Sequence, residues 1–325
     1  MNRIFVTRTL PEPAMQRLRS AELAMDVWPE PGPPPYEELC RRARGVDGLL
    51  TMLTDRIDAG LLDAAGPQLR VISQMAAGVD NIDLAACTAR GIAVGHTPGV
   101  LSDAVADVTI GLMIAAARRF FEAAADMRAG RWTTWEPMGW VGPDLHHATV
   151  GIIGMGRIGA AVGRRLRGFE VRLLYHNRRP SPLAEEVEAE WVALDELLES
   201  SDFVSLHCPY TPETHHLIDA TALAKMKSTA ILVNTARGGV VDQEALVQAL
   251  RSGQILAAGL DVFTPEPLPP DHPLLALPNV AALPHIGSAS IVTRVKMAQM
   301  AVENLLAGLA GQRLPHCANP EVYDK

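Results

Sequence analysis

Short apolar runs, rich in β-branched residues, recur along the whole chain at intervals too long for hairpins. A first series lies at residues 3–7, 48–53, 69–75 and 92–97, and a second at 149–154, 170–177, 202–208, 230–236, 257–263 and 280–286. Segments of helical character separate the runs, and this alternation is typical of parallel sheets covered by helices. The chain is therefore predicted to be an α/β protein with two such units.

Three glycines follow the first run of the second series with the spacing G-x-G-x-x-G. Gly154, Gly156 and Gly159 stand in TVGIIGMGRIGAAVG, directly after a predicted strand and before a predicted helix. In such a loop the first glycine allows a tight turn, the second lets the backbone approach a pyrophosphate, and the third lets helix and strand pack closely. The phosphates would lie at the helix N-terminus. The second unit is predicted to bind a dinucleotide.

Two helical segments indicate how the units are connected. Residues 101–119 begin with a serine able to cap and end in a basic pair, and their apolar residues on nearly all faces predict burial between domains or against another subunit. Residues 290–309 also have helical spacing and could run back to the first unit. We expect two Rossmann-like domains with a cleft between them, one flavodoxin-like and discontinuous (1–99 and 286–325, binding substrate), and one dinucleotide-binding (100–285).

Composition excludes several classes of partner. Of the 325 residues 48% are hydrophobic and 20% charged, which is globular, and the net charge of −8 gives no broad basic surface for nucleic acid. The first residues lack the apolar core of a signal peptide, and the most apolar helical stretch is too short to span a bilayer. The four cysteines form no C-x-x-C pair. We expect a cytoplasmic protein with reduced thiols and no membrane or nucleic-acid partner.

The end of the next strand carries arginines in place of an acid. NAD-binding versions of this fold place Asp or Glu about 20 residues after the glycines, on the ribose hydroxyls. Here His176 stands at that place, followed by Asn177, Arg178 and Arg179. Two arginines could form forked, charge-assisted bonds to a 2′-phosphate. The pattern favours NADPH, with NAD possible, against the alternative of a solvated surface pair.

Three polar residues follow strands of the second series, where open α/β sheets carry their sites. They are Arg237 in NTARGGVVD, Glu266 in GLDVFTPEPL and His285 in LPHIGSAS. Hydride transfer to a 2-keto acid needs a cation for the carboxylate, a proton donor for the carbonyl oxygen and a group that tunes the donor. A carboxylate beside histidine favours its protonated form. Each residue taken alone could be structural, and the three together indicate catalysis.

These motifs resemble the D-isomer-specific 2-hydroxyacid dehydrogenase family, and within it the glyoxylate/hydroxypyruvate reductases. AAGVDNIDLAA, GMGRIG, NTARGGVVDQEAL, AAGLDVFTPEPLPPDHPLL and LPHIGSAS occur in family order over nearly the whole chain. By this resemblance Arg237 binds the carboxylate and carbonyl of the substrate, His285 is the acid/base and Glu266 hydrogen-bonds His285. Glu266 also argues against the formate-oxidising branch, which has glutamine there.

The resemblance implies further contacts. Backbone amides of Ala76, Ala77 and Gly78 would cradle the substrate carboxylate, and Leu53 would line the pocket. Trp135 matches a tryptophan that reaches the partner's substrate pocket, so a homodimer is implied. Its alternative is ordinary core or loop packing. The cofactor site is predicted to contain Gly154, Met155, Gly156, Arg157, Ile158, Gly159, Asn177, Arg178, Arg179, Cys208, Pro209, Thr235, Ala236, Asp261 and Gly287.

No metal site is predicted. The histidine pairs at 146–147 and 215–216 suggest ligands at first sight, but adjacent side chains converge poorly and no third ligand is evident. Both pairs are therefore interpreted as surface residues.

The hypothesis from sequence is an NADPH-preferring reductase that converts glyoxylate to glycolate or hydroxypyruvate to D-glycerate. One alternative is a related dehydrogenase acting on another D-2-hydroxy acid, phosphoglycerate or phosphite. Another is a non-enzymatic dinucleotide sensor, because the C-terminal-binding-protein co-repressors resemble this family and keep the same three polar residues. Turnover distinguishes the sensor from the enzymes.

Overall fold

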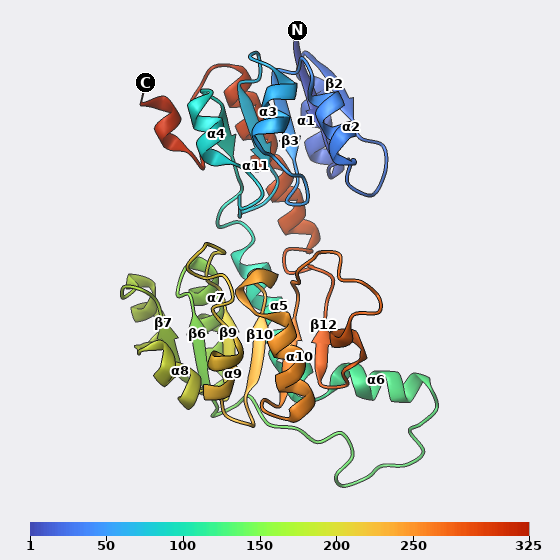
Figure 1. Ribbon diagram of the computed structural model, residues 1–325, viewed down its shortest axis with the longest axis vertical. Helices are drawn as coiled ribbons and strands as arrows, with labels where there is room; N and C mark the ends of the chain where they lie inside the picture. Colours follow the sequence, from blue (N-terminus) through green and yellow to red (C-terminus); the bar gives the residue numbers. More distant parts are fainter. Residues whose placement is uncertain (325) are drawn as a thin grey trace. The chain divides into compact units, whose positions relative to one another are not determined.

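The computed structural model describes residues 1–324, and the chain divides into two compact units. The first unit comprises Met1–Leu101 and the chain from Ala289 onward, and the second comprises Ser102–Ser288. Each has its own parallel sheet (Figure 1). No helix in the described part of the chain combines the length and apolar composition that a membrane crossing requires.

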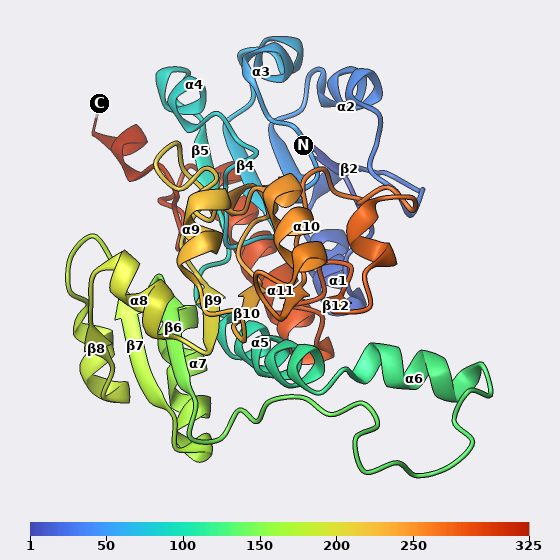
Figure 2. The same cartoon turned by 60° about the horizontal axis from the view of Figure 1, so that its bottom comes forward.

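The first unit is a five-stranded parallel sheet with strand order β2-β1-β3-β4-β5. Its strands are β1 (Asn2–Val6), β2 (Leu23–Val27), β3 (Gly48–Thr51), β4 (Val71–Gln74) and β5 (Ala93–Gly95). Its helices are α1 (Glu12–Ser20), α2 (Tyr36–Ala43), α3 (Ala59–Ala65), α4 (Leu84–Ala89) and α11 (Ile291–Leu309), followed by the 3-10 turn η5 (Pro320–Tyr323). Helices α2, α3 and α4 cover one face, and α1 and α11 cover the other (Figure 2).

Helix α11 belongs to the first unit because it packs closely on that sheet. It contacts β3, β4 and β5, and a Cβ added at Gly308 would meet the Cβ of Val71 at 2.6 Å. Ser73 Oγ donates to the carbonyl of Ala301 at 2.7 Å, and Asn304 Nδ2 donates to the carbonyl of His96 at 2.9 Å. Small residues and buried hydrogen bonds therefore join the end of the chain to its beginning.

The second unit is a seven-stranded parallel sheet with strand order β12-β11-β10-β9-β6-β7-β8. Its strands are β6 (Thr149–Ile153), β7 (Arg172–His176), β8 (Glu190–Trp191), β9 (Phe203–Leu206), β10 (Ile231–Asn234), β11 (Ala257–Leu260) and β12 (Val280–Ala282). Its α-helices are α5 (Ser102–Ala117), α6 (Phe120–Arg128), α7 (Arg157–Leu166), α8 (Leu194–Ser200), α9 (Ala220–Lys225) and α10 (Gln243–Ser252). The 3-10 turns are η1 (Arg167–Phe169), η2 (Pro182–Val187), η3 (Gly238–Val240) and η4 (Pro273–Ala276).

The strand order of the second sheet reverses between β6 and β9. Chain connections leave this point in opposite directions, and ligands of open α/β sheets bind outside the carboxyl ends of the strands there. The glycine-rich loop follows β6, so the topology places it at this switch point.

Helix α5 differs from its sequence prediction at both ends. Ser102 is the first residue of the helix rather than its cap, and the basic pair 118–119 lies beyond its end. Arg119 has a left-handed backbone, with φ of 54°, and pairs with Glu122 of α6. Its buried side chains pack against α7 and strands β10 to β12 of the same unit, whereas the sequence predicted burial between domains or against another subunit.

Helix α6 and the chain after it form an exposed segment of the second unit, residues 120–141, which we call the arm. None of the side chains of α6 is buried. In both views α6 and the chain that follows it project from the body of the second unit. The arm is therefore a surface feature of this chain.

Candidate active site

The glycine-rich loop shows a different physical reason for each of its three glycines. Gly154 has φ of 103°, and a Cβ there would lie 2.5 Å from the backbone N of Cys208. A Cβ on Gly159 would lie 2.5 Å from the carbonyl oxygen of Gly154, whereas one on Gly156 would meet nothing within 4 Å. The outer glycines are thus required by backbone conformation and packing. The middle one, at the N-cap of α7, leaves open space in which a phosphate fits.

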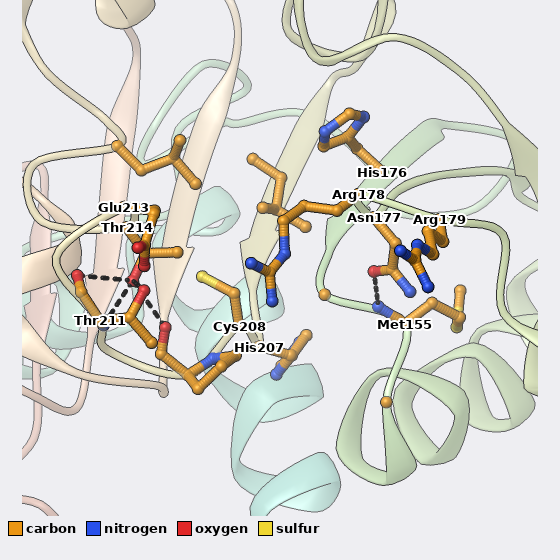
Figure 3. Close-up of a pocket in the computed structure, with 15 residues that line it drawn as sticks. Met155, His176, Asn177, Arg178, Arg179, His207, Cys208, Thr211, Glu213 and Thr214 are labelled. Carbon is orange, nitrogen blue, oxygen red and sulfur yellow. Dashed lines mark hydrogen bonds between the residues drawn. The ribbon is translucent and has the colours of Figure 1, made fainter. Parts of the chain in front are cut away.

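A pocket of about 830 Å³ opens at this loop (Figure 3). The loop and the ends of β7 and β9 contribute its wall, namely Ile153, Gly154, Met155, Gly156, His176, Asn177, Arg178, Arg179, His207, Cys208, Pro209, Thr211, Glu213, Thr214 and Leu217. Its size and its place at the switch point suit part of a dinucleotide. The open space beside the backbone of Gly156 also suits the phosphates of a dinucleotide.

The turn after β7 is held in place on both sides. Asn177 Oδ1 accepts a hydrogen bond from the backbone N of Met155 at 2.7 Å, which ties the turn to the glycine loop. On the other side Trp191 Nε1 donates to the carbonyl of Asn177 at 3.1 Å, and its ring stacks on His176. The His176 Nδ1 lies 2.9 Å from the carbonyl oxygen of Val192. The His176 side chain thus contacts Trp191 and Val192 at the edge of the sheet.

Arg178 and Arg179 are exposed and line the pocket. In Figure 3 the side chain of Arg178 reaches across the pocket toward Cys208, while Arg179 lies nearer to Met155. The carboxylate among the lining residues is Glu213, whose pKa is lowered chiefly by a hydrogen bond from Thr211 and further by the charge of Arg178. Two cations therefore face the pocket where NAD-binding relatives of the fold carry an acid.

The end of β9 contributes two uncharged side chains to the pocket. Burial raises the pKa of the Cys208 thiol to about 11, so it stays protonated at neutral pH. Burial lowers the pKa of His207 to about 3, and its Nε2 lies 2.8 Å from Ser205 Oγ. His207 was not predicted as a site residue, because a histidine inside an apolar run does not indicate that its side chain lines a pocket.

His285 and Glu266 form a hydrogen-bonded pair in the second unit. His285 Nδ1 lies 2.7 Å from Glu266 Oε2, and each side chain is 27% exposed. Glu266 Oε1 accepts a hydrogen bond from the backbone N of Phe263 at 2.9 Å. Burial alone would raise the pKa of Glu266, but the bond and charge of His285, the bond from Phe263 and the charge of Arg237 lower it overall. The carboxylate is therefore ionised near neutrality.

Asp261 supports the backbone around His285. Its two carboxylate oxygens accept hydrogen bonds from the backbone N of Ile286 and of Gly287, each at 2.7 Å. Its carbonyl accepts from the backbone N of His285 at 2.9 Å. Burial is the main cause of a raised pKa for Asp261. The residue predicted to be a cofactor neighbour therefore also shapes the loop that carries the histidine.

Arg237 follows β10 and lies close enough for its charge to act on Glu266. Asn234 Nδ2 donates to the carbonyl of Arg237 at 2.9 Å, which sets the turn. A Cβ on Gly238 would overlap the backbone of Phe263, so the turn packs directly on the loop that leads to Glu266. The second unit thus brings together the three residues that the sequence predicted to act together.

The other predicted cofactor neighbours follow strands β6, β9, β10 and β12. Thr235 Oγ1 is 2.9 Å from Thr109 Oγ1 of α5, and the backbone N of Ala236 donates to Asn234 Oδ1 at 3.0 Å. Gly287 is buried against Asp261 and Val105. Arg157 and Ile158 open α7 after the glycine loop, and Pro209 lines the pocket. Thr109 was not predicted, because its contact with Thr235 joins distant segments of the chain. Asn234 was not predicted either, although its contacts with Ala236 and Arg237 are local.

The predicted substrate contacts Leu53, Ala76, Ala77 and Gly78 lie in the first unit. Leu53 is in the turn after β3, and residues 76–78 form the loop after β4. The carbonyls of this loop are all engaged: Ala76 accepts from Thr97 N at 2.8 Å, Ala77 lies 2.9 Å from His96 Nδ1, and Gly78 accepts from Gln74 Nε2 at 2.8 Å.

Trp135 lies in the arm and is 78% exposed, so the alternative of ordinary core packing is wrong for this chain taken alone. The histidine pairs are exposed as predicted: residues 146–147 lie beside Asp144 and Glu170, and residues 215–216 stack on each other. Among the described residues no group of histidine, cysteine or acidic side chains has the geometry of a metal site.

A doubly wound sheet with a glycine-rich loop at its switch point, and an Arg–Glu–His cluster at the same edge, defines a class: the nicotinamide-dinucleotide-dependent oxidoreductases. The family model for the "D-isomer specific 2-hydroxyacid dehydrogenase, NAD binding domain" matches residues 110–287. The chain belongs to this family and is an NAD(P)-dependent oxidoreductase of it.

Relatives and solved structures agree with this assignment. The chain is 49% identical over 322 residues to the glyoxylate reductase of Korarchaeum cryptofilum, covering 98% of this chain and 96% of the relative. It is 48% identical over 316 residues to the glyoxylate reductase/hydroxypyruvate reductase of Mus musculus, covering 96% of each. A crystal structure of an NADPH-dependent glyoxylate/hydroxypyruvate reductase from Sinorhizobium meliloti, in complex with NADP and malonate, has a TM-score of 0.83 at 33% identity, covering 98% of this chain and 97% of that one.

Proposed function

We propose that the chain is an NADPH-preferring reductase of glyoxylate and hydroxypyruvate, forming glycolate and D-glycerate. The observation that carries the cofactor preference is the pair Arg178 and Arg179 in the wall of the dinucleotide pocket. The choice of keto acid is supported by relatives near 49% identity that are named for these substrates and match nearly the whole chain.

His285 is the proton donor in this proposal. Its Nδ1 is engaged by Glu266, so Nε2 is the nitrogen left to face a substrate oxygen. The bound nicotinamide supplies the hydride for the carbonyl carbon. His285 supplies the proton that the carbonyl oxygen needs, and the ionised Glu266 stabilises the imidazolium before transfer. In the oxidative direction the neutral imidazole would accept the same proton.

Arg237 binds the carboxylate and carbonyl oxygens of the substrate in this proposal. Guanidinium forks match carboxylates in geometry and charge. The turn is set by Asn234 and by the packing of Gly238 on Phe263, so the arginine is presented from a well-supported loop. Orientation of the keto acid against the hydride donor follows from such anchoring.

The loop at residues 76–78 would supply the second anchor, with Leu53 lining the space for the rest of the acid. A trans peptide points its N–H opposite to the carbonyl of the same peptide. The carbonyls of Ala76 and Ala77 point to Thr97 and His96, so the N–H groups of Ala77 and Gly78 point the other way. Converging N–H groups form a concavity that suits an anion.

A homodimer is the proposed assembly, with Trp135 entering the partner's substrate pocket. The arm exposes seven large apolar side chains, which are Phe120, Phe121, Met127, Trp132, Trp135, Met138 and Val141. Seven exposed large apolar side chains within one surface segment favour an interaction site.

We propose that the first unit, predicted from the sequence as residues 1–99 and 286–325 and observed as Met1–Leu101 with the chain from Ala289 onward, binds the substrate. We also propose that the enzyme acts in the cytoplasm.

The test is loss of nicotinamide absorbance with NADPH and, separately, NADH against glyoxylate, hydroxypyruvate, pyruvate and phenylpyruvate. We expect rapid NADPH oxidation with the two small acids and slower turnover with phenylpyruvate. An NADH preference would contradict the role of the arginines. Turnover of neither small acid would contradict the substrate assignment and favour another D-2-hydroxy acid, phosphoglycerate or phosphite.

A further inference from the structure

The first unit contains a polar network at the carboxyl ends of its central strands, and Asn81 is its junction. The amides of Asn81 and Gln74 face each other and exchange two hydrogen bonds of 2.8 Å each. Asn81 Nδ2 also donates to the carbonyl of Asp55 at 2.7 Å and lies 3.3 Å from the carbonyl of Met52. One side chain therefore joins the turn after β3 to the loop after β4.

The network continues to β1 through Asp55. The carboxylate of Asp55 is buried, and its Oδ2 accepts from Thr7 Oγ1 at 2.5 Å and from the backbone N of Met52 at 2.8 Å. Arg8 Nη1 lies 3.9 Å from the other oxygen. The turn that contains Leu53 is thus tied to β1 at its base and to Asn81 at its side.

Gln74 carries the connection into the loop at residues 76–78. Its side chain is fully buried, and its Nε2 donates to the carbonyl of Gly78 at 2.8 Å. Residues 52–55 and 76–78 are turns and bends rather than strands, so the sheet alone does not set their distance from each other. The hydrogen bonds between Asn81 and Gln74 hold the two segments at a fixed distance.

We infer that Asn81 is a positioning residue for the keto acid site, which keeps the Leu53 turn and the amides of the 76–78 loop in one register. The inference rests on the proposed function, in which those two segments contact the same small substrate. Loss of the Asn81 amide would free both segments at once. Misplacement of anchoring groups by about 1 Å reduces catalysis by up to about 100-fold.

The test compares Asn81→Ala with a matched control, Asn319→Ala. Asn319 is a buried asparagine of the same unit whose side chain also makes four hydrogen bonds, with Val94 N, Ile92 O, Thr88 Oγ1 and Cys317 Sγ, at the outer strand β5. Both variants should lower the melting temperature. Asn81→Ala should raise the KM for glyoxylate about tenfold or more and leave the KM for NADPH within about twofold, while Asn319→Ala changes neither.

A second variant covers the case in which Asn81→Ala does not fold. Gln74→Met keeps side-chain volume and removes the amide that reaches Gly78. It should raise the KM for glyoxylate in the same direction, and the double variant should show less than the product of the two effects, because both act through one network. Unchanged KM in the variants that fold would overturn the inference.

Binding of oxalate to the NADP⁺ complex, measured by calorimetry, separates this inference from the proposed function. A wild type that does not reduce glyoxylate but binds oxalate, with weaker binding only in Asn81→Ala, would overturn the function and support the inference. A wild type that reduces glyoxylate, with oxalate binding unchanged by Asn81→Ala, would support the proposed function and overturn the inference. A wild type that neither reduces the acid nor binds oxalate would overturn both.

Discussion

Replacement of Glu266 by glutamine tests the proton-donor role of His285 most directly. The variant removes the negative charge and keeps one acceptor oxygen, whereas Glu266 accepts with both, from His285 Nδ1 and from the backbone N of Phe263. A hydrogen bond to a charged partner contributes about 1.5–3 kcal/mol, against about 1 kcal/mol for a neutral one. With the amide oxygen toward His285, the protonated imidazole should lose about 0.5–2 kcal/mol of stabilisation. At about 1.4 kcal/mol per factor of ten, the rate of reduction near neutrality should fall about 2- to 30-fold.

Comparison of reduction and oxidation across a pH range tests the effect of the Glu266 charge on His285 a second time. The pKa of Glu266 is lowered, so the carboxylate is ionised throughout an assay between about pH 5 and 9. Without the charge, the imidazolium loses stabilisation over this whole range, so kcat/KM for reduction should be lower for Glu266→Gln at every pH in it. Oxidation of the hydroxy acid needs the neutral imidazole, so removal of the charge should lower oxidation less than reduction.

Stopped assays across this pH range would measure kcat/KM in both directions. Reduction would be assayed with glyoxylate and NADPH, and oxidation with glycolate and NADP⁺. Glu303→Gln is the matched control, because Glu303 is an ion-paired carboxylate on the surface, 2.8 Å from Arg17. A Glu266→Gln enzyme with the wild-type kcat and kcat/KM in both directions across this pH range would refute the assigned roles of both residues.

Three further outcomes follow from the cofactor site and the arm. Replacing Arg178 and Arg179 by alanine should raise the KM for NADPH about tenfold or more and leave that for NADH nearly unchanged, and equal effects would reduce the pair to surface charges. Gly156→Ala should keep the wild-type melting temperature but weaken NADPH binding in a fluorescence titration, whereas Gly159→Ala, whose Cβ would meet a backbone oxygen at 2.5 Å, should unfold at lower temperature. Trp135→Ala should lower kcat/KM for glyoxylate, because the side chain enters the partner's substrate pocket in the proposed dimer, and unchanged kcat/KM would remove it from the site.

The sequence predicted the parallel sheets because the central strands are continuous buried runs, and it predicted the family from motifs in family order. The edge strands β2 and β8 were missed. β8 consists of Glu190 and Trp191, both exposed, so it has no buried face to produce a pattern. The sequence of β2, LAMDV, has one polar residue among five, so it shows no alternation of apolar and polar residues, and its residues are half-buried or exposed. These two edge strands lack the signal that burial on both faces gives to central ones, whereas the edge strand β5 is buried throughout and was predicted.

The proximity of Arg237, Glu266 and His285 was predictable, because each follows a strand of the same parallel sheet. Residues that act by holding other segments were not. Asn81 reads as part of a polar loop, and nothing in the sequence shows that its amide meets Gln74 and the turn before Ile57. Such contacts depend on which strands are neighbours, and sequence spacing does not give this.

The backbone at His285 shows how residues of the second unit orient the candidate catalytic side chain. His285 has φ of 53°, a conformation that costs a residue with a side chain about 1–2 kcal/mol. The surroundings offset this cost, because Asp261 accepts three hydrogen bonds from consecutive backbone N–H groups, one of them from His285 itself. Glu266 then holds the ring from the other side. Strain that is maintained by so many partners persists where it sets the direction of a functional side chain. The histidine is therefore oriented by residues of its own unit, as a proton donor in the proposed mechanism requires.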